Sequence, residues 1–230
     1  MATRFYLSQT TSDISPAIDA VWDAGPAVRR ELTLTKESTG ADTLTSTKTG
    51  SSNFYHCAAQ YITPLLASIS AVLAVSKAAF RCYEVEKDDN ASLHLVFRKC
   101  DDVGGNLVTI GSITDDTELV DGSLANRFVG ASNLTDQSFS EDDRLIVEVG
   151  VFFNNTKNET DVAYIHIIDN NASDLPENDT ETAAYNCWIE TGDTFAESGG
   201  VITRSIAGAL GFSGGATRKL IGSRGIAGVL

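Results

Sequence analysis

The sequence predicts an all-β protein, an antiparallel β-sandwich of jelly-roll-like type with a Gly/Ala-rich C-terminal extension. Three observations support this fold class. Short segments rich in β-branched and aromatic residues alternate apolar with polar side chains. Runs of Asp, Asn and Gly, which favour turns, separate these segments. Near residue 198 the composition changes, so we expect a β-sandwich domain over 1–197 and a basic assembly tail over 198–230.

Alternation along the chain locates the individual strands. The strongest candidate is 144–153, where Leu145, Val147, Val149 and Val151 would share one face with Phe153. Further strands are expected at 30–35, 93–98, 107–113, 162–168 and 187–190. The segment 67–80 is compatible with a helix or a buried strand, and we interpret it as a strand.

Composition excludes some classes of protein. With 230 residues and 42% apolar content, the chain is large enough to bury a core. The net charge of −14 argues against a nucleic-acid partner, because phosphate binding depends on Lys and Arg. No run of about 18 apolar residues is present, so we expect no membrane association. The first residues do not form a secretion signal, so we expect the chain to be made in a cytoplasm and to stay there until it is released.

No pattern of catalytic residues is recognisable. The three histidines are isolated, and neither a GxSxG nor an HExxH motif occurs. We therefore expect no catalytic residue, no cofactor and no enzymatic activity. A polysaccharide hydrolase is a third hypothesis, which would require a cleft with paired carboxylates. The loop 169–181 is the best Ca²⁺ candidate, but we interpret it as a solvated acidic loop and expect no metal.

The four cysteines do not form a metal-binding or redox motif. Cys57, Cys82, Cys100 and Cys187 are far apart in the sequence and lack CxxC spacing. We expect buried free thiols, and a single disulfide is the alternative.

The tail differs from the domain in charge and in flexibility. It contains no acidic residue, and Ile206–Leu210 is repeated in similar form as Ile226–Leu230. Its many glycines disfavour an independent helix by about 1 kcal/mol each relative to Ala. Its apolar residues disfavour a solvated linker, so we expect ordering against a partner, with a disordered end as the alternative.

The expected assembly-interface residues are Arg4, Phe5, Tyr6, Arg204, Ile206, Leu210, Phe212, Arg218, Lys219, Leu220 and Ile226. The first three are expected to lie on an edge strand.

Several segments together point to a known group of proteins. These segments are 3–7, 15–17 with the Trp22 region, 126–128, 143–150, 169–190 and 203–214. In these patches the chain resembles a widespread group of virion structural proteins of tailed bacteriophages. The resemblance implies a β-sandwich scaffold that assembles into a particle, and it supplies no catalytic residues.

The main functional hypothesis is a non-enzymatic virion structural protein, displayed on the capsid or the tail as a decoration or tail-associated component. Its expected partners are further copies of itself and other virion proteins. The alternative is a carbohydrate-binding module for host surface glycans. Trp22, in an irregular segment, and Tyr185 are the aromatic residues proposed for glycan contact.

Overall fold

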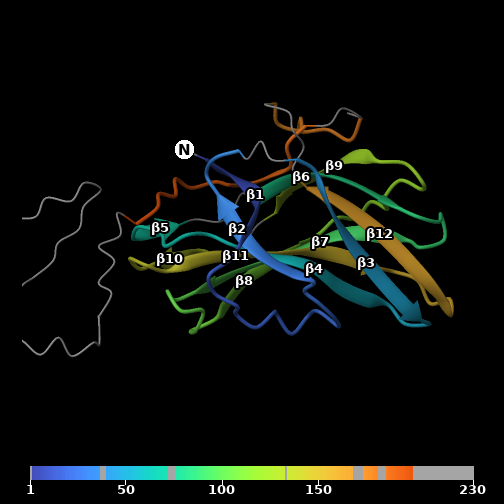
Figure 1. Cartoon of the computed structure of the whole chain (residues 1–230), viewed down its shortest axis with the longest axis horizontal. Coiled ribbons are helices and arrows are strands. Elements are labelled where there is room, and N and C mark those ends of the chain that lie inside the picture. Colours follow the sequence, from blue (N-terminus) through green and yellow to red (C-terminus); the bar gives the residue numbers. More distant parts are fainter. Residues whose placement is uncertain are drawn as a thin grey trace, which may run out of the picture. The chain divides into compact units, whose positions relative to one another are not determined.

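The computed structural model describes residues 2–36, 40–71, 76–132, 134–167, 173–180 and 185–198. Within these residues the chain forms thirteen strands and no helix (Figure 1). The strands are β1 Thr3–Thr11, β2 Val28–Thr33, β3 Asp42–Gly50, β4 Phe54–Ile62, β5 Ile69–Ala71, β6 Ser76–Glu84, β7 Ala91–Cys100, β8 Val108–Thr114, β9 Ala125–Ser132, β10 Gln137–Phe139, β11 Arg144–Phe153, β12 Glu159–Ile167 and β13 Trp188–Thr191. The residues up to Ser198 form one compact unit.

Eleven of these strands form one large sheet. Its order is β3-β12-β6-β13-β1-β2-β4-β11-β7-β8, and β9 also pairs with β6. β2 runs parallel to β4, whereas the other paired strands of the described chain are antiparallel. β5 and β10 form a separate two-stranded sheet. The fold is therefore the all-β sandwich that the sequence predicts.

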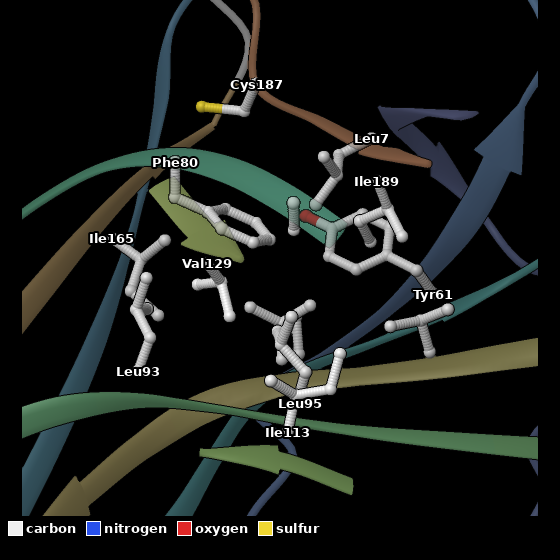
Figure 2. Close-up of a cluster of buried hydrophobic side chains, with 14 of the residues drawn as sticks. Leu7, Tyr61, Phe80, Leu93, Leu95, Ile113, Val129, Ile165, Cys187 and Ile189 are labelled. Carbon is white, nitrogen blue, oxygen red and sulfur yellow. The ribbon is translucent and has the colours of Figure 1, made fainter. Parts of the chain in front are cut away.

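The core lies between two parts of the large sheet. Figure 2 shows Phe80, Val129 and Ile165, from β6, β9 and β12, facing Leu93 and Leu95 of β7. All five side chains are at least 98% buried. Removing apolar area from water is the main force that favours folding, so this layer contributes most of the stability of the unit.

The expected strands are largely confirmed. β11 has the predicted bounds, and β2, β7, β8, β12 and β13 overlap the predicted segments within a few residues at each end. The segment 67–80 contains β5 and the start of β6, so its interpretation as a strand is also confirmed. β3, β4, β9 and β10 were not predicted.

The position of β1 differs from the expectation of an edge strand, which is wrong. β1 pairs with β13 on one side and with β2 on the other, so it lies inside the sheet. Phe5 is only 1% exposed, and its ring packs 5.7 Å from that of Phe195. Its alternation with half-buried Arg4 and Tyr6 directs Phe5 into the core of its own domain, so its side chain is not available to a neighbouring molecule.

The cysteines are free thiols, as expected. All four are buried, and none forms a disulfide. Burial raises the pKa of Cys100 to about 11, so this side chain stays protonated at neutral pH. The four side chains therefore act as small apolar groups.

Candidate functional site

The two faces of β11 have different environments. Its odd-numbered side chains, from Leu145 to Phe153, are fully buried in the main core. Because side chains alternate along a strand, Glu148, Gly150 and Phe152 lie on the opposite, outer face. This outer face, which continues across β4 and β7, contains the polar groups from which a site can be built.

One half of the outer face is closed by the segment 12–27. There Glu148 is fully buried and accepts hydrogen bonds from four residues. The donors are the Asp19 backbone N at 3.1 Å, Trp22 Nε1 at 2.6 Å, Gln60 Nε2 at 3.0 Å and Arg98 Nη1 at 3.0 Å. The buried carboxylate is thus compensated both by a cation and by neutral donors, as a buried charge requires.

Gly150 allows the segment 12–27 to pack closely on β11. A Cβ atom at this position would lie 2.0 Å from the His56 carbonyl oxygen and 2.7 Å from the Trp22 ring. The Trp22 ring meets that of His94 edge-on, with 5.0 Å between centroids. Burial lowers the pKa of His94 to about 4, so the imidazole is neutral at neutral pH. Its Nδ1 lies 2.8 Å from Thr114 Oγ1.

The other half of the outer face holds a pocket of about 300 Å³. Three regions of the chain meet there: the start of β7, the end of β8 with the loop that follows it, and the end of β11. The lining residues are Asn90, Ser92, Thr114, Asp115, Asp116, Glu118, Phe152 and Asn154. Two amides, two hydroxyls and three carboxylates thus surround one aromatic ring.

Phe152 and Ser92 form the inner part of this pocket. They are opposite each other on the paired strands β11 and β7. The Phe152 ring stacks on Tyr55, with 4.3 Å between centroids and 20° between planes. Ser92 is 9% exposed, and its hydroxyl has no hydrogen-bond partner in the described part of the chain. Its hydroxyl oxygen is accessible to solvent rather than enclosed, so it can bond to water or to a ligand in the pocket.

The carboxylates around the pocket differ in their surroundings. Asp115 Oδ2 lies 2.5 Å from Arg127 Nε and is therefore neutralised, whereas Asp116 is exposed. Glu118 is hydrogen-bonded to Glu84, which is 1% exposed and lies outside the lining. Burial, with the charge of Glu118, raises the pKa of Glu84 to about 8, so Glu84 keeps its proton at neutral pH. None of the described residues that line the pocket is Lys or Arg.

The two aromatic residues proposed for glycan contact differ in their burial. Trp22 was expected in an exposed or interface position, and this is wrong: it is 6% exposed. The segment that contains it folds back on the sheet, so its ring covers Gly150 and its indole N–H bonds to Glu148. Tyr185 is half-buried against the main core, and its role in glycan contact stays a prediction.

Arg4 and Tyr6, predicted at an assembly interface, contact residues of their own domain. The Arg4 guanidinium lies 2.9 Å from Asp174 and 2.8 Å from Glu190. It also stacks over the buried Trp188 ring at 3.9 Å. Tyr6 donates its hydroxyl to Asp174 at 3.2 Å. Both side chains remain partly exposed, so their contact with a neighbouring molecule stays a prediction.

The remaining predicted interface residues, from Arg204 to Ile226, lie outside the described residues. So does part of the loop 169–181 that was the best Ca²⁺ candidate. In its described part, Asp174 contacts Arg4 and Lys36, and Asp179 accepts from the Phe128 backbone N. Among the described residues, no group of three or more His, Cys, Asp and Glu side chains is arranged to hold a metal ion. The described segments also include no helix long and apolar enough to span a membrane.

No protein-family model matches the sequence, and no curated protein matches it. Three solved structures show distant similarity. A mitogen from Yersinia pseudotuberculosis is 13% identical, with a TM-score of 0.22, and the match covers 63% of this chain and 96% of the mitogen. A CocE/NonD family hydrolase from Staphylococcus aureus is 12% identical, with a TM-score of 0.27, and 86% of this chain and 34% of the hydrolase are covered. The structure of infectious bursal disease virus, Gx strain, is 12% identical, with a TM-score of 0.19. The match covers 77% of this chain and 40% of the viral chain. At these scores the similarities carry no argument about function.

Proposed function

We propose that the chain is a non-enzymatic structural protein of a bacteriophage virion. In this proposal the β-domain is displayed on the capsid or the tail. The segment 198–230 attaches it to neighbouring copies or to other virion proteins. The virion would be assembled in the host cytoplasm.

The observation that carries this proposal is the division of charge along the chain. All 31 Asp and Glu residues lie before residue 199, together with 13 of the 17 Lys and Arg. The compact unit that ends at Ser198 therefore has a net charge of −18, and the remaining segment has a net charge of +4. Segments of opposite charge on identical chains attract each other, which favours association between copies.

The contacts within the domain support this reading, because its own cations are already paired. Among the described residues, at least ten of its 13 Lys and Arg side chains form ion pairs with carboxylates of the same domain. Exposed carboxylates such as Asp102, Asp116 and Glu141 thus carry the excess negative charge. Arg204, Arg218, Lys219 and Arg224 provide complementary positive groups in the segment after the domain.

Light scattering after size-exclusion chromatography tests the proposal. The full chain is compared with a chain that stops at Ser198, which retains the entire described core. We expect a discrete oligomer for the full chain and a monomer for the shortened one. A full-length triple variant, R204E/R218E/K219E, should also be monomeric, because it removes the charge complementarity and keeps the chain length. Monomers for both the full and the shortened chain would overturn the proposal.

The alternative function, recognition of host surface glycans, no longer rests on Trp22. The observation that favours it is the pocket beside Phe152, which offers hydrogen-bonding groups next to an aromatic ring. The two functions are compatible, since a displayed domain is well placed to contact a cell surface.

A further inference from the structure

We propose that the pocket beside Phe152 binds one uncharged sugar ring. This inference concerns a site that none of the predicted contact residues lines. It rests on the geometry of the described domain and does not depend on the proposed role in a virion.

The size of the pocket fits a single ring. Its volume of about 300 Å³ lies at the lower end of the range of small-molecule sites, about 300–1,000 Å³. Such a site accepts a monosaccharide or one residue of a longer glycan. The remaining residues of a glycan would extend into solvent through the open side of the pocket.

The aromatic ring of Phe152 provides the apolar contact. Because Tyr55 stacks on Phe152, the orientation of the ring is fixed before a ligand arrives. A preorganised ring loses little conformational entropy on binding. A sugar ring has an apolar C–H face, which can lie on such a surface while its hydroxyls point to the polar lining.

The polar lining suits hydroxyl groups that both donate and accept. Asp116 and Glu118 carry acceptor oxygens, and the amides of Asn90 and Asn154 carry donors as well as acceptors. Adjacent hydroxyls of a sugar can bond to one carboxylate or amide in a bidentate manner. This arrangement recognises a polyol, whereas a purely apolar ligand would leave the lining groups desolvated and unpaired.

Ser92 provides a hydroxyl that a ligand in this pocket can reach. The residue is about nine-tenths buried and lines the pocket, and its hydroxyl has no partner among the described residues. On the closed half of the same face, Glu148 is bonded to several donors. A ligand hydroxyl in the pocket would replace the water that bonds to the accessible Ser92 hydroxyl.

The charge of the lining selects among sugars. The described lining residues include three carboxylates and no Lys or Arg, and within the described chain only Asp115 of the three is paired with a cation, Arg127. An acidic sugar or a phosphorylated one would be repelled by Asp116 and Glu118. We therefore expect binding of neutral sugars and exclusion of sialic acid.

Saturation-transfer NMR with the full chain tests this inference. The probes are the methyl glycosides of glucose, galactose and mannose, and N-acetylglucosamine, with sialic acid as the negative probe and glucosamine as the cationic probe. We expect saturable binding of at least one neutral sugar and none of sialic acid. S92A and D116N should each weaken this binding at least tenfold, because each removes a direct bond to the ligand.

Two controls keep the result interpretable. T45A and D136N change exposed side chains outside the pocket and should bind as the unmodified chain does. Thermal unfolding of S92A and D116N checks that both variants are folded.

The inference is overturned if no neutral sugar binds, or if a folded S92A and a folded D116N bind as well as the unmodified chain. Binding of glucosamine alone, lost in D116N and unchanged in S92A, would also overturn it, since the site would then recognise a cation.

Discussion

The closed and the open halves of the outer face around β11 differ in how their polar groups are satisfied. In the closed half, the segment 12–27 covers the sheet, and the Glu148 carboxylate accepts bonds from four residues. In the open half, Ser92 is 9% exposed, and its hydroxyl, which bonds to no described residue, is accessible to solvent. The same strands build both halves, so the difference lies in what covers them. The comparison indicates that the closed half serves stability and the open half is available for a ligand.

Removing the Glu148 side chain should cause the largest effect. In E148A the Arg98 guanidinium stays buried without its main partner, which costs about 3–5 kcal/mol of unfolding free energy. Urea unfolding measures this change. D116A, on the open half, is the matched control and should change stability by less than about 0.5 kcal/mol. A loss below about 1 kcal/mol in E148A would show that the closed half is not held by this carboxylate.

Adding a methyl group at Gly150 should separate the covering segment from the sheet. The new Cβ would collide with the His56 carbonyl and the Trp22 ring, and we expect a loss of about 1–3 kcal/mol with a red shift of Trp22 fluorescence. Gly130, also in a strand, has no neighbouring atom within 4 Å of the position that an added Cβ would take. G130A should therefore be neutral or slightly stabilising. Equal stability of both variants would contradict the close packing proposed for Gly150.

Stability should depend on pH through Glu84, next to the open half. Its pKa is about 8 in the folded chain, above the ordinary value of 4.5, so the folded state holds this proton more tightly. The resulting stabilisation is complete below pH 4.5 and is lost as the pH rises through 8, by up to about 1.4 kcal/mol per pH unit. Urea unfolding at several pH values should show this slope in the unmodified chain and a reduced slope in E84Q. An unchanged slope in E84Q would exclude Glu84 as its source.

The smallest effect on stability is expected for S92A. Because the Ser92 hydroxyl bonds to no described residue, its removal should change the unfolding free energy by less than about 0.5 kcal/mol. This result, together with the loss of sugar binding, would separate a binding role from a structural one. A loss of more than about 1 kcal/mol would mean that Ser92 stabilises the fold itself.

Much of the fold is readable from the sequence where one face of a strand is apolar. β11 alternates from Leu145 to Phe153 and was predicted with its observed bounds. β3 was missed because two of its inward positions are polar, Ser46 and Lys48. Lys48 is buried through an ion pair with Asp161 at 2.6 Å, a partner 113 residues away. β4 was missed because both of its faces are covered, so its sequence does not alternate.

The pocket could not be predicted for a different reason. Its lining comes from positions 90–92, 114–118 and 152–154, which are brought together by the pairing of β7 with β8 and β11. Nothing local marks these residues, apart from the outward position of Phe152 in an otherwise well-predicted strand. Trp22 was misjudged because its segment has no regular pattern, and its burial depends on Gly150 and Glu148. Long-range pairing, rather than local propensity, determines both sites.

Chemical cross-linking in the full chain tests the central claim, assembly through the basic segment, most directly. A carbodiimide joins a lysine Nζ to a carboxylate in direct contact, and an equal mixture of unlabelled and ¹⁵N-labelled chains distinguishes links between copies from links within one. The ion pair between Lys157 and Asp88 provides an internal control, which should give links within one chain. We predict mixed-isotope peptides that join Lys219 to a carboxylate of residues 1–198. Links from Lys219 only within one chain, or none at all, would contradict the account.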